Sequence, residues 1–336
     1  MKLMKQGNST LVVALALLLA GCGGSQPPIG APGAMLQSRA NARHAARGGS
    51  WMLPQAASQD LLYVSDTTWV SVYSYPDGRL EGRLRHFYIA QGMCVDKQGD
   101  VYVTDLGYNK IFVYAHGAKK RLRTLVGWAG PVGCSVDSTT GNLAASSLGD
   151  GSNNAVAVYK NARGNPTIYK DPDFSEYFWC GYDNKGNLFV DGLGHGQGSG
   201  GFEFAELSKG RSTLKTITLN QSMGWPGGVL WDGKHMAVGS YYPPPSGHPV
   251  IYQFAISGST GTKVGTTQLG RLGSVDDVKQ FWIQGETVIA PDGGSRYGGR
   301  GAAVFYKYPV GGKPIKRITK GILSSQSTVV SVAPSH

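Results

Sequence analysis

Short runs of alternating apolar and polar residues recur along the chain after residue 60. An Asp-x-x-Gly sequence at residues 96–99 leads into the alternating run 100–104, and residues 183–186 lead into a similar run at 187–190. Alternation with a period of two predicts β-strands, and the Gly-containing turn before each run predicts a hairpin. No helical periodicity of useful length follows residue 60, so the pattern predicts an all-β domain.

The same unit returns six times. Each unit has a strand with an aromatic or apolar pair: Val72-Tyr73, Val113-Tyr114, Val158-Tyr159, Glu203-Phe204, Ile251-Tyr252 and Phe305-Tyr306. A turn glycine follows each pair: Gly78, Gly117, Gly164, Gly210, Gly258 and Gly311. The spacing is about 47 residues, and four strands fit in each unit, in the second at about 91–95, 100–104, 110–115 and 121–126. Such a period with four strands is typical of a β-propeller. We therefore predict six four-stranded blades over residues 60–336.

The two ends of this repeat region complement each other. The first unit begins partway in, at residues 60–66, and lacks its innermost strand. The segment 327–333 reads as a strand with no unit of its own. We expect it to supply the missing strand beside residues 60–66 and to close the ring, because closure removes long exposed sheet edges.

The N-terminus has the pattern of an export signal. Lys2 and Lys5 precede an apolar run at residues 11–20, which is too short to span a bilayer, since about 20 apolar residues are needed. Leu19-Ala20-Gly21-Cys22 resembles the bacterial lipobox, in which the Cys receives a diacylglyceryl group and becomes the mature N-terminus. The resemblance implies a signal peptide at residues 1–21 and a membrane anchor at Cys22. The alternative is an ordinary signal peptide with an incidental Cys.

Residues 22–59 follow the cleavage site. They are rich in Ala, Arg, Gly and Gln, and they show no apolar periodicity. We expect a flexible tether between the lipid and the propeller. Gly23 stands where an Asp would favour retention in the inner membrane of a Gram-negative cell, so the sequence favours the outer membrane there.

The repeat units resemble those of NHL-type six-bladed propellers. That family's unit runs Gly-x-x-x-Asp-x-x-Gly-Asn-x-Tyr-Val-x-Asp and continues into a strand ending Val-Tyr. Units two and four carry this motif clearly at residues 96–105 and 183–191, whereas units three, five and six are looser copies. The resemblance covers about residues 60–336 and implies an NHL-like bacterial lipoprotein.

Composition and charge narrow the choice of partner. The chain has 50 Gly and 17 Tyr but only 16% charged residues, which suits a β-rich extracytoplasmic domain with many turns. The net charge is +11, but basic residues are scattered, with one short cluster at 119–121. Nucleic acid is therefore excluded as the expected partner. The sequence predicts no cofactor.

Unequal loops on blades three to six suggest one decorated face. Aromatic side chains with adjacent polar groups are a usual way to bind sugars or extended peptides. The candidate ligand-binding residues are Trp128, Trp179, Trp225, Tyr241, His195 and Arg296. For the three tryptophans, packing between blades is an equally good interpretation. The prediction is a non-catalytic binding or scaffold propeller for an envelope glycan, peptide or protein partner.

A hydrolase is the alternative function. Gluconolactonase-like six-bladed enzymes hold a divalent metal at the channel mouth with Glu, Asn and Asp, which implies Glu176, Asp173, Asn220 and Asp277 as conceivable ligands here. They match no family motif residue by residue, and the chain has no Gly-x-Ser-x-Gly nucleophile motif. The repeated Asp66, Asp105 and Asp292 end second strands and could be ligands on the open face, but such residues more often accept backbone N–H bonds in their own turn.

Three cysteines remain after Cys22. They are Cys94, Cys134 and Cys180, so at most one disulfide forms and one thiol stays free. Cys134 and Cys180 occupy the same register, three residues before Asp137 and Asp183. We expect both to be small buried apolar residues on inner strands of neighbouring blades, with a bridge between these two as the open alternative.

Overall fold

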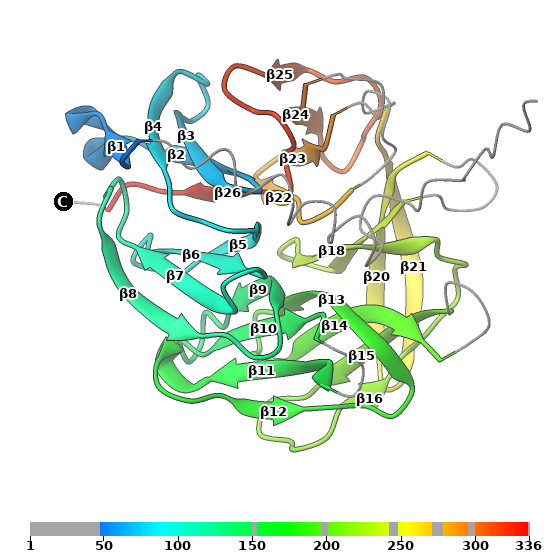
Figure 1. The fold of residues 1–336 in the computed structure, drawn as a ribbon. Coiled ribbons are helices and arrows are strands. Elements are labelled where there is room, and N and C mark those ends of the chain that lie inside the picture. Colours follow the sequence, from blue (N-terminus) through cyan, green and yellow to red (C-terminus); the bar gives the residue numbers. More distant parts are fainter. Residues whose placement is uncertain are drawn as a thin grey trace, which may run out of the picture.

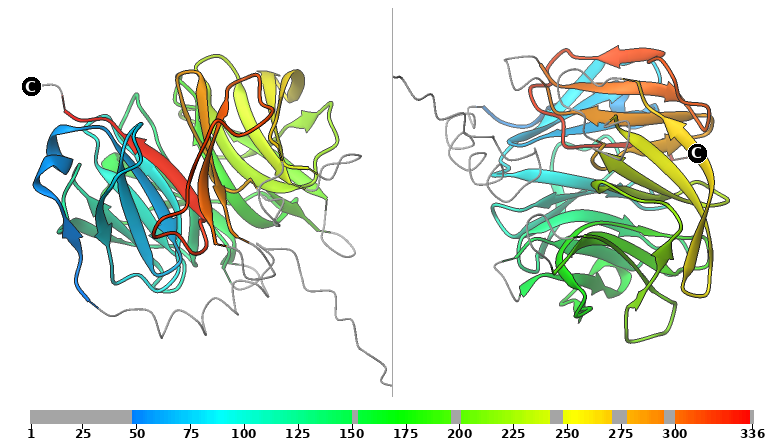
Figure 2. Two further views of the ribbon diagram at one scale, coloured as in Figure 1. Left: turned by 90° about the horizontal axis from the view of Figure 1, so that it is seen from above. Right: turned by 90° about the vertical axis from the view of Figure 1, so that its right-hand side faces the viewer.

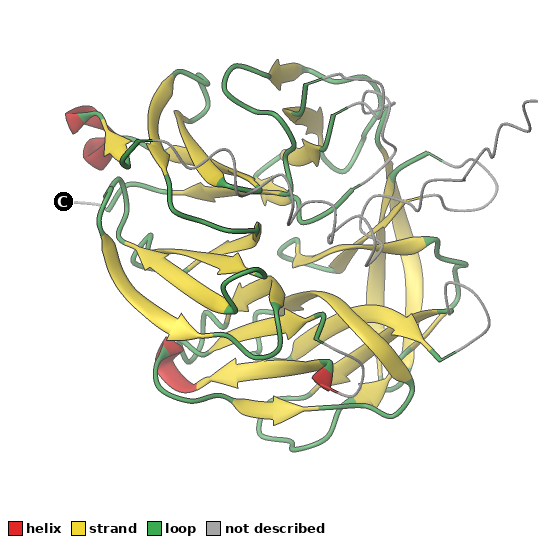
Figure 3. Ribbon diagram, in the orientation of Figure 1, coloured by secondary structure: helices red, strands yellow, loops and turns green. Residues whose placement is uncertain are grey.

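Six β-sheets surround a central axis in this protein (Figure 1). The computed structural model describes residues 48–149, 153–195, 201–241, 248–270, 278–294 and 300–334. Nearly all regular structure in these ranges is strand (Figure 3), with short 3-10 helices at η1 (Pro54–Ser58) and η3 (Lys160–Ala162). The predicted six-bladed propeller is confirmed, and Figure 2 shows the ring from its side.

Blades two to four have four strands each. Blade two contains β5 (Ala90–Val95), β6 (Val101–Asp105), β7 (Lys110–Tyr114) and β8 (Arg121–Val126). Blade three contains β9 (Pro131–Val136), β10 (Leu143–Ser147), β11 (Ala155–Tyr159) and β12 (Thr167–Tyr169). Blade four contains β13 (Phe174–Tyr182), β14 (Leu188–Gly194), β15 (Phe202–Leu207) and β16 (Lys215–Thr216). The strands predicted for the second unit agree with blade two within one residue.

Blades five and six continue the order. Blade five contains β18 (Trp225–Trp231), β19 (Met236–Tyr241), β20 (Val250–Ser257) and β21 (Thr260–Gln268), with β17 (Thr218–Leu219) added in parallel to β21. Blade six contains β22 (Trp282–Gln284), β23 (Thr287–Asp292), β24 (Ala302–Lys307) and β25 (Lys316–Ile318). β20 and β21 form the longest hairpin among the described strands.

Blade one joins the two ends of the chain. Its order is β1 (Trp51–Met52), β4 (Leu80–Leu84), β3 (Trp69–Ser74), β2 (Leu61–Asp66) and β26 (Ser327–Ser331). β26 pairs antiparallel with β2 from Leu61 opposite Ser331 to Ser65 opposite Ser327. All five residues of β26 are buried. The C-terminal strand therefore closes the ring, as predicted.

The first blade begins before the expected boundary at residue 60. Trp51 and Met52 pair with Arg83 and Gly82 of β4, and Ala56 in η1 is fully buried. Residues 51–58 thus belong to the blade rather than to the predicted tether. This segment is too short to show a periodic apolar pattern, so the burial of Ala56 could not be predicted from the sequence. Residues 1–47, including the predicted signal peptide and Cys22, lie outside the described residues.

The six turn glycines behave as the repeat predicts. Each has a positive φ between 60° and 81°: Gly78, Gly117, Gly164, Gly210, Gly258 and Gly311. Residues with a side chain rarely adopt this conformation, so glycine is required at the turn after the third strand. The turns recur once per blade, which is why their spacing revealed the repeat.

The second strands β2 and β6 each end in an aspartate. Its carboxylate binds backbone N–H groups of the segment that leads into an inner strand. Asp66 accepts hydrogen bonds from the backbone N–H groups of Leu323 and Ser324 at 2.6 and 2.9 Å, just before β26. Asp105 does the same for Tyr88 and Ile89 before β5, at 2.8 and 3.1 Å. The predicted structural role of these carboxylates is confirmed, although their donors lie mainly in the incoming loop rather than in their own turn.

The disulfide joins Cys94 to Cys134, and Cys180 is free and buried. The predicted count of one bridge and one thiol is confirmed, but the alternative bridge between Cys134 and Cys180 is wrong. The Cα atoms of Cys94 and Cys134 lie 5.7 Å apart, on inner strands β5 and β9 of neighbouring blades. Gly92 allows this approach, because a Cβ there would collide with the Val132 carbonyl.

Within the described residues, no helix has the length and apolar character needed to cross a membrane.

Candidate functional site

The ring has two unlike faces. Inner strands begin, and second strands end, at one face, which we call the loop face. They meet in tight turns at the other, which we call the hairpin face. In blade five, for example, Trp225 pairs with Tyr241 at the loop face, and Trp231 pairs with Met236 at the hairpin face. The sequence placed its candidate residues on the loop face.

Two of the candidates meet on blade five. The ring of Trp225 stacks on that of Tyr241, with centroids 6.4 Å apart and an interplanar angle of 15°, and meets the edge of Phe178 at 6.1 Å. Tyr241 is only 1% exposed, whereas Trp225 is half-buried. Of this pair, therefore, Trp225 is the side chain that still offers surface to a ligand.

Two other candidates connect neighbouring blades. Trp179 is 4% exposed, and its indole N–H donates to the Pro226 carbonyl at 3.3 Å, from blade four to blade five. Trp128 is half-buried against the core between blades two and three, and it donates to the Asn153 carbonyl at 2.9 Å. These contacts are those of the packing interpretation that the sequence left open.

The remaining candidates do not form a cluster that the structure describes. His195 follows the last residue of β14 and is exposed. Arg296 lies outside the described residues. Of the residues predicted for the loop face, the structure leaves Trp225, Trp128 and His195 accessible.

The alternative metal ligands are dispersed. Asn220 uses its side-chain oxygen to accept the backbone N–H of Lys263 at 2.7 Å, on the outer part of blade five. Asp173 is exposed, and its carboxylate accepts a hydrogen bond from Thr216 at 3.4 Å. Asp277 lies outside the described residues. Across the described ranges, no three His, Cys, Asp or Glu side chains are grouped so that they could hold a metal ion.

Glu176 is the one member of that set with an unsatisfied group. Its Oε2 atom is buried and has no hydrogen-bond partner in the described part of the chain. Burial raises the pKa of this carboxyl. An isolated buried carboxyl is stabilised by staying protonated, so this feature alone does not require a cation.

The central channel is closed in its middle. The side-chain oxygen of Gln280 accepts the backbone N–H of Met93 at 3.1 Å, and its nitrogen donates to the Cys134 carbonyl at 2.9 Å. This one buried amide therefore joins blades six, two and three across the axis. A Cβ added at Gly92 would collide with it, so the amide lies directly against the inner strand of blade two.

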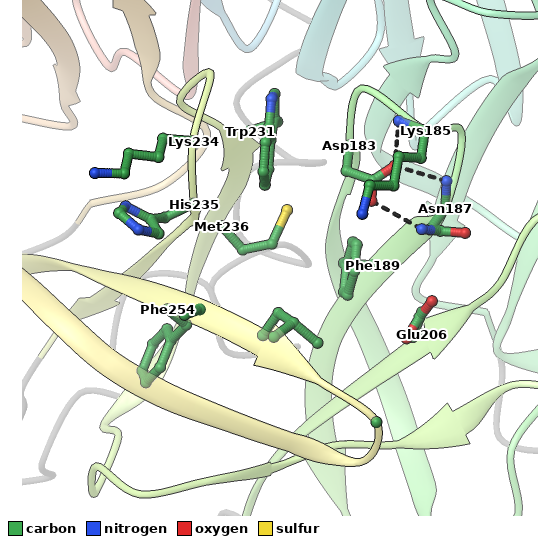
Figure 4. A pocket seen from close by; sticks show the side chains of 13 residues that line it. Asp183, Lys185, Asn187, Phe189, Glu206, Trp231, Lys234, His235, Met236 and Phe254 are labelled. Carbon is green, nitrogen blue, oxygen red and sulfur yellow. Dashed lines mark hydrogen bonds between the residues drawn. The ribbon is translucent and has the colours of Figure 1, made fainter.

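A hollow opens below this plug, at the hairpin face. It has a volume of about 260 Å³ and lies among the ends of the inner strands. Its lining includes Tyr182, Asn184, Trp231, Trp282 and Ser135. A second hollow of about 460 Å³ lies between blades four and five and shares Asp183 and Trp231 with the first (Figure 4).

The sequence candidates did not include these residues. A signal was nevertheless present, because the position directly before the hairpin Asp is Val95 or Val136 in units two and three but Tyr182 or Trp231 in units four and five. The change from Val to an aromatic side chain marks blades four and five, between which the second hollow lies. This signal was missed because unit five is a loose copy of the repeat, so Trp231 was not aligned with Val95 and Val136.

Comparisons with known proteins support the fold. No family model matches the chain, and no curated protein matches it. A chain in the crystal structure of a nidogen/laminin complex has a TM-score of 0.65 at 11% identity, covering 82% of this chain and 100% of that chain. A protein of unknown function from Bacteroides caccae has a TM-score of 0.59 at 12% identity, covering 82% and 99%. A functionally unknown protein from Desulfotomaculum acetoxidans has a TM-score of 0.55 at 12% identity, covering 82% and 100%. At such identities the likeness concerns the fold alone.

Proposed function

We propose that this protein is a lipid-anchored, extracytoplasmic propeller of the NHL-like type that binds a glycan, peptide or protein partner and catalyses no reaction. In a Gram-negative cell its Cys22 lipid would hold it at the outer membrane. The partner would be recognised on the faces of the ring, with Trp225, Trp128, His195 and Arg296 available on the loop face.

The observation that carries this proposal is that polar groups near the axis are engaged in hydrogen bonds that hold the ring together. The Gln280 amide plugs the channel, and the carboxylates of Asp66 and Asp105 hold backbone N–H groups. These groups serve the scaffold rather than a reaction. What the described ring offers to a partner is surface, and closed propellers are suited to present such surfaces rigidly.

The cysteine pattern supports an extracytoplasmic location. Disulfides persist in oxidising compartments and are rare in the bacterial cytosol. The Cys94–Cys134 pairing between two blades agrees with an exported chain. It is independent of the N-terminal motif, and both features favour the same location.

The anchor is tested by labelling cells with radioactive palmitate. The wild-type chain should incorporate label and fractionate with membranes, whereas Cys22→Ala should do neither. Unlabelled wild-type protein would contradict the anchor.

Binding is tested by placing a photo-cross-linking residue at His195 on the loop face and, separately, at Lys234 on the hairpin face. A discrete adduct at either position supports the binding role, and the absence of any adduct at both contradicts it.

The hydrolase alternative has its own test. We expect the purified protein to contain less than one equivalent of divalent metal, because Asn220 is engaged elsewhere and no group of metal-binding side chains surrounds Glu176 among the described residues. Elemental analysis measures this directly. A stoichiometric ion in the wild type that is lost in Glu176→Gln would reverse the assignment.

A further inference from the structure

The two hollows of the hairpin face lie next to each other and share two lining residues. They meet at Asp183 and Trp231, and we call their joint lining the blade 4–5 groove. The outer hollow alone, at about 460 Å³, falls within the 300–1,000 Å³ typical of ligand sites. The groove runs from the axis outwards between two blades, so it suits an elongated ligand.

Its walls are held in place by hydrogen bonds. Asp183 accepts the backbone N–H groups of Lys185 and Asn187, both at 2.8 Å. On the other side, Asp232 accepts the N–H groups of Lys234 and His235, at 2.8 and 2.6 Å. Figure 4 shows these two turns facing each other across the groove. The turns are therefore preorganised, which lowers the entropic cost of binding.

The floor of the groove is apolar and partly aromatic. Phe189 and Met236 lie between the two turns and Phe254 lies below them (Figure 4), and these three side chains are buried. Trp231 is shared by the two hollows. Trp231 is half-buried, so part of its ring is open to the groove. Trp282 adds a second half-buried indole at the inner end. Flat apolar surfaces of this kind can receive the C–H face of a sugar ring.

Several polar groups of the groove are unused. In the described part of the chain, no hydrogen bond or ion pair is made by the Trp231 indole N–H, the Lys185 and Lys234 ammonium groups or the His235 ring. Glu206 has one carboxylate oxygen that accepts from Ser208 at 2.9 Å, and its other oxygen is open. The groove thus combines free donors with a free acceptor, which is what hydroxyl groups require.

Charge and backbone pairing limit the ligand class. Lys185 and Lys234 are balanced by Asp183 and Glu206, so the charges of these four side chains cancel. Four strands that line the outer hollow, β14, β15, β19 and β20, are paired on both sides, whereas β18, which ends at Trp231, is the innermost strand of its sheet. In the outer hollow an extended peptide therefore finds no free edge along these four strands, and β18 offers one only at its last residue. A neutral ligand with many hydroxyl groups fits these conditions.

We propose that the blade 4–5 groove binds a neutral oligosaccharide, with one sugar ring on the indole of Trp231 and its hydroxyls on Lys185, Lys234 and Glu206. This proposal rests on the binding function proposed above, but it names the ligand class and moves the site to the opposite face from the sequence candidates.

The test uses the mature lipoprotein in detergent micelles. Cellotetraose, chitotetraose and maltotetraose are titrated by calorimetry, with an extended acidic peptide as a competitor class. We expect one tetrasaccharide to bind and to change tryptophan fluorescence. Trp231→Ala should weaken that binding about tenfold or more, since an aromatic contact contributes about 1.4 kcal/mol. Lys234→Ala, at an exposed position, should weaken it several-fold without affecting the fold.

Trp51→Ala, at an exposed tryptophan on blade one, is the matched control and should bind as the wild type does. Trp225→Ala tests the loop face in the same assay. Loss of binding in Trp225→Ala but not in Trp231→Ala would overturn the groove while leaving the binding function intact. Binding of the peptide in place of every sugar, abolished by Trp231→Ala, would overturn the sugar class but keep the site. Absence of binding by all four probes would overturn the proposal, and the photo-cross-linking result would then decide the binding function separately.

Discussion

The loop face and the hairpin face use their aromatic side chains differently. On the loop face, Trp179 is 4% exposed and Tyr241 1% exposed, so these two rings serve the packing between blades, whereas Trp225 and Trp128 are half-buried but border neither hollow. On the hairpin face, Trp231 and Trp282 are half-buried and border a groove. The difference teaches that an aromatic residue near a long loop is not by itself a ligand site. Its burial within the ring decides its role.

The largest effect should follow from opening the ring that both faces share. Removal of residues 325–336 deletes β26, whose Val329 and Val330 are almost fully buried, and exposes the inner edge of β2. We expect loss of cooperative unfolding, because the first blade then lacks its innermost strand. Calorimetry of the truncated chain measures this. A transition unchanged from that of the full chain would refute the closure.

The two faces should differ sharply in the stability cost of losing a tryptophan. Trp179→Ala should lower the free energy of unfolding by about 3–5 kcal/mol, the usual cost of truncating a buried aromatic side chain. Trp231→Ala should cost about 1–2 kcal/mol, because part of its ring is already in solvent. Chemical denaturation of both variants gives the comparison. An equal loss in the free energy of unfolding for the two variants would contradict the difference in burial between Trp179 and Trp231.

The disulfide joins two blades beneath both faces. Its loop of 40 residues predicts a stabilisation of about 4 kcal/mol relative to the reduced chain. Unfolding with and without reductant measures this difference. A thiol assay on the unfolded, unreduced protein should find one free thiol, that of Cys180, and three after reduction. Three free thiols before reduction would contradict the pairing.

The free energy of unfolding should depend on pH through Asp66 at the loop face. Burial raises the pKa of this carboxyl to about 6, although its backbone hydrogen bonds and Arg83 act in the opposite direction. A raised pKa means that the folded protein holds the proton more tightly. The contribution of Asp66 to stability is therefore greatest below pH 4 and is lost as the pH rises through about 6, by up to about 3 kcal/mol.

Asp66→Asn removes this titration and serves as the reference. Relative to the variant, the wild type should lose stability between pH 4 and pH 6 in urea denaturation. A constant difference across that range would show that the hydrogen bonds from Leu323 and Ser324 outweigh burial.

Much of the fold was readable from the sequence because it repeats. The turn glycines require a left-handed backbone once per blade, and the unmatched strand near residue 330 could only complete the first unit. The pairing of Cys94 with Cys134 was not readable, since it depends on how closely Gly92 lets two inner strands approach. Nor was the burial of Trp179, which results from contact with a neighbouring blade rather than from its own strand.

The contrast between the faces is tested most directly by hydroxyl-radical footprinting of the intact lipoprotein, free and in the presence of the tetrasaccharide that binds. In the free protein we predict strong labelling of Trp231 and Trp282 and weak labelling of Trp179 and Tyr241. The sugar should protect Trp231 and leave Trp225 unchanged. Strong labelling of Trp179, or protection of Trp225 without protection of Trp231, would contradict the account.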